Sequence, residues 1–446
     1  MPKIKLAISD LHLADGHPLL DSFNDHQQSA LEGLLNAASS NGSLGDAEDV
    51  ELIINGDCFD FLMMRPYEQH GTTNPATALL KLEKVFAAHR PFFEALQRFI
   101  SFPGRHVTFI TGNHDVELIF QEVQARICEF ILGELGRREC VDFCHTRSYR
   151  PLPDVYIEHG NQYDFWNRIC DIWDEQGQPL TLKPQAITLP LGTQYIQRGA
   201  HHINAQYSYF DHFEPGLSFT RQVALLCLLT PESVVETVQH VMAMLSYSRK
   251  PLAGLSPGEE RIPVKLFVHA IADFAAFQED MVAHAPDFTE PLGQEATQAD
   301  AMMEFIQVSE VMSLPLVEAI TAIFTPGVYQ MAESTAKGMQ HVLHSDSTLR
   351  YAIAGHTHMD RIDPINNGSQ VYLNTGSWTT RFALPGPGEI TPEVIEWLRR
   401  PDWNAIPFRD LTRLVFAFIH AEKGAPSNAS LCAWEGGVKG TYCVLA

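Results

Sequence analysis

The amino-acid sequence predicts a layered α/β core that is interrupted by a long helical segment. Over residues 1–164, short apolar runs bounded by glycine turns alternate with amphipathic helical patterns, as in proteins whose helices pack on a buried sheet. From residue 165 to residue 345 the strand signal nearly disappears and helix-like periodicity dominates, whereas strand-like runs return over residues 346–446. We therefore expect a core in two parts, 1–164 and 346–446, separated by an all-helical insertion, 165–345.

The expected strands are short and buried on both faces. They share an apolar or β-branched run closed by a polar or glycine turn: Lys3 to Ile8, Glu51 to Ile54, His106 to Thr111, Val155 to Glu158, Leu349 to Ala354 and Val371 to Leu373. Continuous runs of this kind are typical of strands inside a layered core. Two later runs, Leu414 to Ala421 and Ser430 to Trp434, predict a hairpin that completes a second sheet.

Helical patterns fill the gaps between these strands. Gln27 to Ala38 places its apolar residues on one stripe, and Val116 to Leu135 repeats them at three- and four-residue intervals. Between them, Ala76 to Ile100 predicts a longer helical region that Pro91 breaks or kinks. Within the insertion the helix-like segments are Gln194 to Phe210, Phe219 to Leu229, Pro231 to Ser246, Lys265 to Ala283, Gln298 to Val311 and Gly327 to Leu343.

Composition and charge narrow the class of protein. The 446 residues are 45% hydrophobic and 19% charged, as in an ordinary globular protein, and the formal net charge is -23. A surface this negative disfavours nucleic acid as a substrate, because affinity for it depends on Lys and Arg neutralising backbone phosphates. Eight scattered cysteines, an N-terminus that runs straight into a strand, and no apolar run long enough to span a membrane predict a cytoplasmic protein.

Five short polar motifs rich in metal-binding side chains occur in order, and four of them directly follow a strand-like run. They are Asp10-Leu11-His12, Gly56-Asp57-Cys58-Phe59-Asp60, Gly112-Asn113-His114-Asp115, His159-Gly160-Asn161 and Gly355-His356-Thr357-His358. Loops at strand ends can deliver these side chains to one edge of a sheet. Carboxylate, amide and imidazole donors that converge there can hold two divalent cations, a combination suited to hydrolysis of a phosphate ester.

A two-metal site needs one carboxylate that touches both ions, and Asp57, on a tight turn after Gly56, is the candidate. The other candidate ligands are Asp10, His12 and His358 for one ion and Asn113, His159 and His356 for the second. Neutral imidazoles combined with oxygen donors favour Mn, Fe or Zn over Ca or Mg, and we expect Mn.

Two further residues are candidates for proton transfer. The ion pair would lower the pKa of a shared water, and the resulting hydroxide would attack phosphorus in line with the leaving oxygen. His114 is placed to protonate that oxygen, and Asp60 to orient the His114 imidazole. Asn161, Arg65 and Arg381 are candidate substrate contacts, although surface ion pairs explain the two arginines equally well.

Taken together, the motifs resemble the pattern of the calcineurin-like metallophosphoesterase superfamily: D-x-H, G-D-x-x-D, G-N-H-[DE], H and G-H-x-H. Any one of these residues alone is more often a helix-capping Asp or a core His. The resemblance covers about residues 3–164 and 349–380. It implies an α/β/β/α sandwich of two mixed sheets with the two metals at one edge, the ligand roles given above, and His114 with Asp60 as the acid/base pair.

Departures from subfamily patterns bear on the substrate. Phe61 stands where protein Ser/Thr phosphatases carry Arg, and Asp115 where they prefer Glu, which disfavours that activity. Bacterial hydrolases that split the pyrophosphate of UDP-diacylglucosamine also have a helical insertion at this place, but carry Arg at the position of His114. The run from His159 to Asp164 is similar to the H-G-x-x-x-D variants of bacterial members that act on small molecules or lipid nucleotides.

Three hypotheses follow. The leading one is a dinuclear metal phosphohydrolase that admits a small or lipid-linked phosphate ester or pyrophosphate into an apolar-lined cleft under the insertion, with peripheral membrane contact left open. The second is a phosphodiesterase acting on nucleic acid, which the acidic composition disfavours. The third is a metal-binding scaffold without catalysis, which should lack ligands or the acid histidine. The sequence does not fix the oligomeric state.

Overall fold

The computed structural model divides the chain into two compact units. The first contains Met1–Gln197, Gln330–Thr380 and Thr412–Ala446, and the second contains Arg198–Tyr329 and Arg381–Leu411. The structure describes residues 3–17, 21–39, 42–44, 47–67, 71–133, 138–164, 167–197, 208–214, 216–217, 219–229, 314–324, 330–403 and 405–445.

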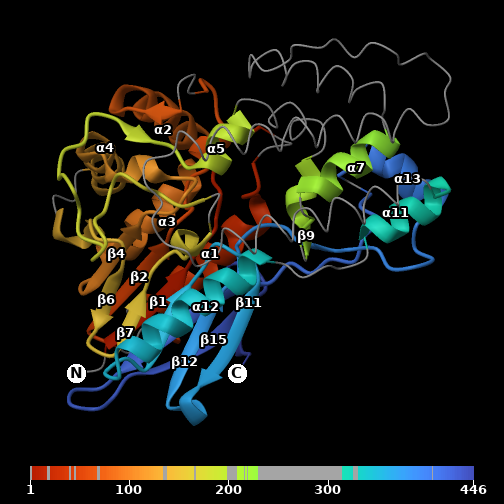
Figure 1. The fold of residues 1–446 in the computed structure, drawn as a ribbon. Helices are drawn as coiled ribbons and strands as arrows, with labels where there is room; N and C mark the ends of the chain where they lie inside the picture. Colours follow the sequence, from red (N-terminus) through yellow and green to blue (C-terminus); the bar gives the residue numbers. More distant parts are fainter. Residues whose placement is uncertain are drawn as a thin grey trace. The chain divides into compact units, whose positions relative to one another are not determined.

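The larger sheet of the first unit has seven strands in the order β16-β15-β14-β1-β2-β4-β5. Their bounds are β1 Lys3–Ile8, β2 Asp49–Asn55, β4 Arg105–Ile110, β5 Val141–Phe143, β14 Leu414–Ala421, β15 Asn428–Glu435 and β16 Thr441–Val444. Strands β1, β2, β4 and β5 run parallel, whereas β14, β15 and β16 are antiparallel to their neighbours. Figure 1 shows β1, β2 and β4 side by side, with their ends directed the same way.

The second sheet of the first unit has five strands in the order β11-β12-β10-β7-β6. Their bounds are β6 Tyr149–Leu152, β7 Val155–Ile157, β10 Tyr351–Ala354, β11 Asp360–Ile365 and β12 Gln370–Thr375. Strands β7, β10 and β12 are parallel, and the two edge strands β6 and β11 are antiparallel to their neighbours. The three central strands are therefore those that the sequence predicts from apolar runs.

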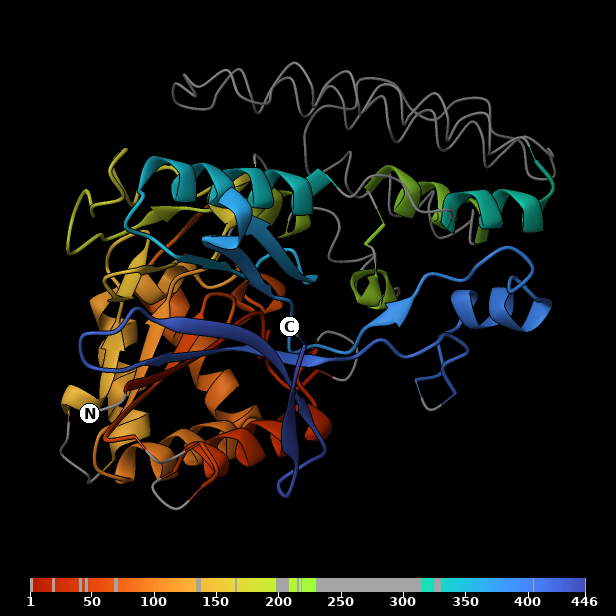
Figure 2. The ribbon, with the colours of Figure 1, turned by 90° about the horizontal axis from the view of Figure 1, so that it is seen from below.

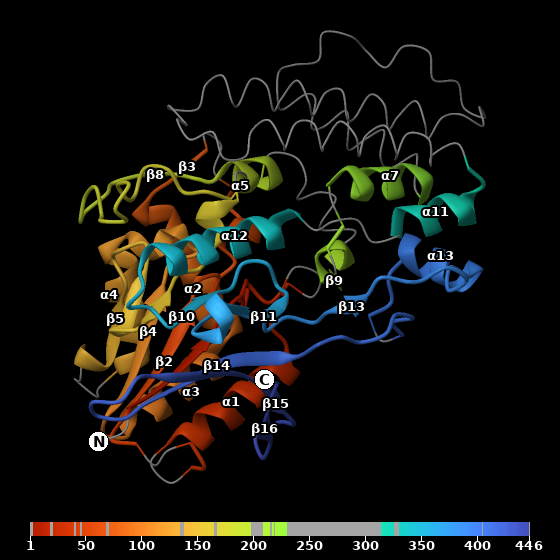
Figure 3. The ribbon, with the colours of Figure 1, turned by 60° about the horizontal axis from the view of Figure 1, so that its bottom comes forward.

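The side-chain alternation of the strands sorts the core into layers. Ala7 and Ile53 of the first sheet pack with Ile353 of the second, whereas Leu6 and Ile54 face away, toward the helices. On the outer face of the second sheet, Tyr156, Ala352 and Tyr372 pack with Met339 and neighbouring residues of α12 (Gln330–Ser345). Figures 2 and 3 show α12 (cyan) and the red and orange helices on opposite sides of the two sheets. The first unit is thus the expected α/β/β/α sandwich.

The helices against the first sheet begin and end where local sequence chemistry predicts. They are α1 Asp25–Ala38, α2 Pro75–Ala88, α3 Arg90–Ser101 and α4 Gln121–Leu132. Asn24 caps α1 by accepting a hydrogen bond from the amide of His26, and Asn74 caps α2 through the amide of Thr77. The predicted break near Pro91 occurs at His89, so that Pro91 lies in the first turn of α3, where its missing N–H costs nothing.

Two expectations about these elements were wrong in detail. The hairpin β14–β15 forms as predicted, but it extends the first sheet, because β14 pairs antiparallel with β1 and not with the second sheet. The helical pattern from Val116 to Leu135 is divided into a 3-10 turn, Val116–Ile119, and helix α4. Both errors concern long-range pairing or a local turn that hydrophobic periodicity does not encode.

The expected insertion, 165–345, contributes short elements to the first unit. Its described residues there include α5 (Leu191–Tyr195), α12, and the two-residue strand β8 (Ile187–Thr188), which pairs with β3 (Thr72–Thr73). The boundaries 1–164, 165–345 and 346–446 stay a prediction.

The second unit is mainly helical over its described residues. It contains α7 (Phe219–Leu229), α11 (Leu316–Phe324) and α13 (Pro392–Arg399), with the two-residue strands β9 (Phe213–Glu214) and β13 (Phe382–Ala383) paired in parallel. Its core is rich in aromatic side chains, and the Tyr209 hydroxyl donates to the Leu398 carbonyl at 2.7 Å. The expected helix from Phe219 to Leu229 is confirmed as α7.

Three predicted helices, Pro231 to Ser246, Lys265 to Ala283 and Gln298 to Val311, lie outside the described residues. The expected apolar cleft under the insertion stays a prediction for the same reason. None of the helices in the described ranges combines the length and apolar character needed to cross a membrane.

Candidate metal centre

All five polar motifs follow the carboxyl end of a strand. Three follow β1, β2 and β4, which are parallel neighbours in the first sheet, and two follow β7 and β10, which are parallel neighbours in the second. Parallel strands end at the same edge of their sheet, so each sheet brings its motifs together. The backbones of the first two motifs also run side by side, because the amides of Leu11 and His12 both donate to the Asp57 carbonyl, at 2.9 and 3.0 Å.

The backbone turns sharply at several of the candidate ligands. Among the described residues, the non-glycine positions with positive φ are Asp10, His12, Asp57, His356, His358, Asn366 and Asn367. Five of these seven are candidate metal ligands. Positive φ is unfavourable for residues with a Cβ, and such backbone strain concentrates at functional sites. All five positions lie shortly after the end of a strand, and the side chains of these residues belong to the groups of possible metal donors.

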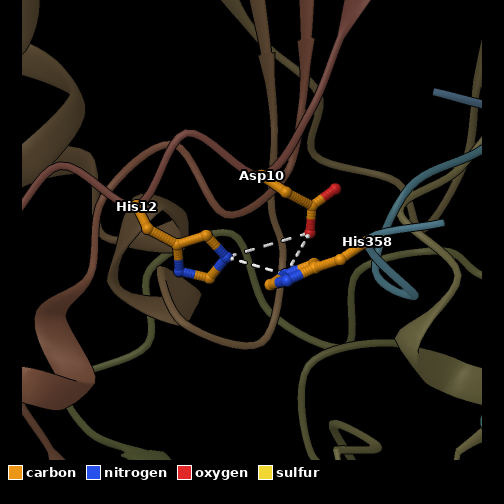
Figure 4. A group of neighbouring side chains, drawn as sticks. All are labelled: Asp10, His12 and His358. Carbon is orange, nitrogen blue, oxygen red and sulfur yellow. Dashed lines mark hydrogen bonds and ion pairs between the residues drawn. The ribbon is translucent and has the colours of Figure 1, made fainter. Parts of the chain in front are cut away.

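The first cluster of donors consists of Asp10, His12 and His358 (Figure 4). His358 Nε2 lies 3.3 Å from Asp10 Oδ1 and 3.1 Å from His12 Nε2, and the third edge, from Asp10 Oδ1 to His12 Nε2, is 3.9 Å. Asp10 is fully buried, and its carboxylate also accepts the backbone amide of His356 at 3.0 Å. The first and fifth motifs are therefore joined at this cluster, as the sequence predicts.

The second cluster consists of Asp57, His159 and His356, with Asn113 beside them. His159 Nε2 lies 3.2 Å from Asp57 Oδ2 and 3.2 Å from Asn113 Oδ1. The imidazole rings of His159 and His356 have centroids 5.3 Å apart. All four side chains belong to buried residues.

Asp57 faces both clusters. Its Oδ2 atom is 3.2 Å from His159 Nε2 in the second cluster and 3.9 Å from His12 Nε2 in the first. Its Oδ1 atom accepts the backbone amide of His114 at 2.9 Å, which fixes the carboxylate plane. This is the position that a bridging carboxylate must occupy.

The donor spacings fit divalent metal ions. Ligand atoms about 2.0–2.2 Å from an ion in tetrahedral or octahedral geometry lie about 2.8–3.6 Å from one another. The separations of 3.1 and 3.3 Å in the first cluster and 3.2 Å in the second lie in this range, and the edge from Asp10 Oδ1 to His12 Nε2, 3.9 Å, is longer. Moreover, His12 Nε2 and His358 Nε2 face each other directly, and two nitrogen lone pairs at 3.1 Å repel unless a proton or a cation lies between them.

In the metal-free centre, the buried carboxylates also favour positive charge on the neighbouring imidazoles. Burial alone would raise the pKa of Asp57, but the imidazoles of His159 and His114 hold it well below its ordinary value. Burial likewise opposes a charged His159, yet the Asp57 carboxylate raises the pKa of His159 to about 9. Protonated imidazoles therefore balance the buried carboxylates when no cation is bound.

His114 and Asp60 form a hydrogen-bonded pair next to the first cluster. His114 Nδ1 donates to Asp60 Oδ1 at 2.9 Å, and the other Asp60 oxygen lies 3.4 Å from His12 Nδ1. Burial opposes a charged His114, but Asp60 and Asp57 raise the pKa of His114 to about 10. Burial would raise the pKa of Asp60, yet His114 holds it below its ordinary value. With Nδ1 engaged, Nε2 is the nitrogen of His114 that remains for proton transfer.

Asp115 has a structural role that sequence reasoning did not assign. Its two oxygens accept the backbone amides of Gly112 at 2.7 Å, Cys58 at 2.8 Å and Phe59 at 3.4 Å. The buried Asp115 carboxylate thus ties the third motif to the second. Its bond back to Gly112, three residues earlier, is local, like the reach of the N3 side chain in a capping box, but its bonds to the second motif depend on tertiary structure.

Glycine is required next to the candidate ligands. A Cβ atom at Gly112 would overlap the side chain of Asp57, and one at Gly355 would overlap the side chain of Asp10. Gly56 has φ +80°, and a Cβ there would overlap the ring of His159. The glycines of these motifs therefore allow the backbone of one motif to approach a ligand of another.

The three candidate substrate contacts are already engaged within the chain. Arg65 is exposed and lies over the ring of Tyr67 at 5.8 Å. Arg381 belongs to the second unit, where it is buried and donates to the Phe213 carbonyl at 3.1 Å. Asn161 is buried, and its amide donates to the Asn167 carbonyl at 2.8 Å. Their roles as substrate contacts stay predictions.

The fold and this centre define a metal-dependent hydrolase built on an α/β/β/α sandwich. Residues 6–205 match the model of the calcineurin-like phosphoesterase family, and this stretch contains four of the five motifs. This part of the chain therefore belongs to the calcineurin-like phosphoesterase family, and the protein is a metal-dependent phosphoesterase. The family implies a dinuclear site for divalent metal ions.

Two solved structures are similar to this chain at low sequence identity. A dimetal phosphatase from Danio rerio is 12% identical, with 100% of this chain and 99% of that chain covered and a TM-score of 0.32. The phosphopantetheinyl hydrolase from Mycobacterium tuberculosis is 11% identical, with 92% and 95% covered and a TM-score of 0.25. No curated protein matches the chain.

Proposed function

We propose that the chain hydrolyses a phosphate ester or pyrophosphate of a small or lipid-linked substrate at a dinuclear centre. The proposed ligands are Asp10, His12, Asp57 and His358 for one ion and Asp57, Asn113, His159 and His356 for the other. The observation that carries this proposal is the convergence of donors from both sheets on Asp57, whose Oδ2 lies within 3.9 Å of His12 Nε2 and 3.2 Å of His159 Nε2. When bound, the two ions supply Lewis-acid charge to the phosphoryl oxygens and lower the pKa of a water.

His114 supplies the proton that the leaving oxygen needs. The side chain of His114 is 21% exposed, more than those of Asp60 and His12, so a substrate can reach it. Because Asp60 accepts from Nδ1, the ring is held in one orientation and Nε2 is left for the leaving oxygen.

The charge of the chain supports a small or lipid-linked substrate over nucleic acid. The formal net charge of -23 opposes the approach of a long polyanion, whereas a single phosphate group can be held by the centre itself. The complete set of candidate ligands and the hydrogen-bonded His114 also disfavour a catalytically silent scaffold. Manganese, expected from the mixed nitrogen and oxygen donors, and a cytoplasmic location are further parts of this proposal.

Metal content and turnover test the proposal together. The purified chain, loaded with Mn²⁺, should bind two ions and hydrolyse bis-p-nitrophenyl phosphate or p-nitrophenyl phosphate, and Asp57→Asn should abolish both properties. Asp346→Asn is a matched control, because Asp346 pairs with Arg150 at the surface, at 2.9 Å. Two bound ions without turnover of any phosphate ester or pyrophosphate would favour the scaffold. A screen across mononucleotides, dinucleotides, sugar nucleotides, phospholipids and single-stranded DNA would then identify the substrate class.

A further inference from the structure

Asp164 lies in contact with a proposed metal ligand, His356. Its Oδ2 atom is 3.3 Å from His356 Nε2, the two residues belong to different loops, and the side chains are only 12% and 3% exposed. We infer that Asp164 is a positioning residue for the second metal ion: it accepts a hydrogen bond from His356 Nε2 and so holds the imidazole with Nδ1 toward the metal. This inference rests on the proposed function, which makes His356 a ligand.

The chemistry of the two groups fixes the direction of the hydrogen bond. An ionised carboxylate can only accept, so the short contact requires a proton on His356 Nε2. A neutral imidazole carries one proton, so Nδ1 is left with its lone pair. The carboxylate therefore selects the tautomer of His356 and with it the atom that can bind a cation.

Two other candidate ligands, His159 and His12, are also contacted by a partner outside the donor cluster, but through Nδ1 and not Nε2. His159 Nδ1 donates to the Asn55 carbonyl at 2.9 Å, and His12 Nδ1 lies 3.4 Å from Asp60 Oδ2. In both cases Nε2 is the nitrogen that faces the donor cluster. His356 is instead in contact with Asp164 at Nε2, which leaves Nδ1 as the nitrogen that would bind the metal.

Asp164 is itself held in position. Its Oδ2 accepts the side-chain amide of Asn167 at 2.6 Å, and its backbone amide donates to the Asn161 carbonyl at 3.1 Å. The loop begins at His159 and turns at Gly160, where φ is 111°. One loop thus supplies a ligand, His159, and also orients a second ligand that arrives from β10. The same contacts would also be found if Asp164 had a purely structural role and only stabilised the loop.

Measurements of metal affinity distinguish the positioning role of Asp164 from the purely structural one. Mn²⁺ binding to the full chain would be measured by equilibrium dialysis with elemental analysis for the wild type, Asp164→Asn, Asp164→Ala and the surface control Asp346→Asn. We expect two ions per chain in every case at saturating Mn²⁺. One of the two should bind roughly 10–100-fold more weakly in Asp164→Ala, as for other outer partners of metal-binding histidines. Asp164→Asn should recover part of this loss, because its carbonyl oxygen can still accept from Nε2.

Nitrogen-15 spectra of the histidine rings report which nitrogen of His356 carries the proton. This tautomer would not change if Asp164 only stabilised the loop. In the metal-free wild type, His356 should show a proton on Nε2, and this preference should be lost in Asp164→Ala; His356→Gln identifies its signals. Unchanged Mn²⁺ affinity in both variants, or an unchanged tautomer, would overturn the inference. So would binding of only one ion at saturation, since Asp164 would then be a direct ligand.

A further variant keeps this test distinct from a test of the proposed function. His159→Ala should lose one of the two Mn²⁺ ions, because His159 lies in the second donor cluster. If His159→Ala keeps both ions, the proposed metal centre itself is wrong. If His159→Ala loses one ion while the Asp164 variants bind as the wild type does, only the role of Asp164 fails.

Discussion

Binding of metal ions should release protons from the buried centre. The raised pKa of His159 gives the number of protons expected from this residue. In the metal-free chain the Asp57 carboxylate raises the pKa of His159 to about 9, against an ordinary value of 6.5. A histidine must be neutral to bind a metal ion. His159 is almost fully protonated at pH 7.5, so it must lose a proton when the second ion binds.

The cost of removing this proton sets the pH dependence of the affinity. At about 1.36 kcal/mol per unit, a pKa two units above a pH of 7 costs roughly 2.7 kcal/mol, or about a 100-fold loss of apparent affinity relative to a fully neutral imidazole. The sign follows from the raised pKa: the apparent affinity for Mn²⁺ should increase about tenfold per pH unit from pH 7 and level off near pH 9.

Calorimetry in buffers of different ionisation enthalpy counts these protons. Mn²⁺ would be titrated into the metal-free chain at pH 7.5 in HEPES and in Tris. The binding enthalpies should differ by about the difference between the ionisation enthalpies of the two buffers, which corresponds to one proton released by His159. Asp346→Asn should behave as the wild type does. Equal heats in both buffers, together with an affinity that does not change between pH 7 and pH 8.5, would refute the placement of His159 as a ligand.

Three further predictions follow from the same geometry. His114→Ala should lower kcat by about 10²–10⁴-fold while both Mn²⁺ ions remain bound, since the imidazole acts on the leaving oxygen and not on the metals; equal loss of metal would assign it a different role. Gly112→Ala should lower the melting temperature and reduce Mn²⁺ binding at both positions, because the new Cβ would displace Asp57; normal metal content and stability would contradict the close approach. In the metal-free chain, the pKa of His114 is raised from 6.5 to about 10, so its stabilising contribution is complete below about pH 6.5 and is lost as the pH rises through about 10. Urea unfolding with a chelator present should show this decline in the wild type, and a smaller one in His114→Gln.

The strands that carry the motifs could be predicted because their signal is local. Lys3–Ile8, Arg105–Ile110 and Tyr351–Ala354 are apolar or β-branched runs that end in a polar turn, so pattern and burial agree. Strand β11, Asp360–Ile365, was missed because it is a half-buried edge strand that contains charged residues and a proline. It is stabilised by its antiparallel pairing with β12, which the composition of the segment does not reveal.

The convergence of the candidate ligands could be predicted from the sequence, whereas most of their hydrogen-bond partners could not. Motif order indicated that Asp57 and His159 should meet, and they lie 3.2 Å apart. The contact of Asp164 with His356, by contrast, joins loops after β7 and β10, and the bonds of Asp115 to the second motif join loops after β4 and β2. Such contacts depend on how two strand ends approach in three dimensions, and no spacing along the chain encodes that approach.

Crystals of the full chain soaked in Mn²⁺ would test the central claim most directly, through anomalous scattering at the manganese edge. We predict two anomalous peaks about 3.5–4 Å apart, with Asp57 between them, one peak beside His12 and His358 and the other beside His159 and His356. A single peak, or peaks away from Asp57, would contradict the dinuclear centre on which the proposed function depends.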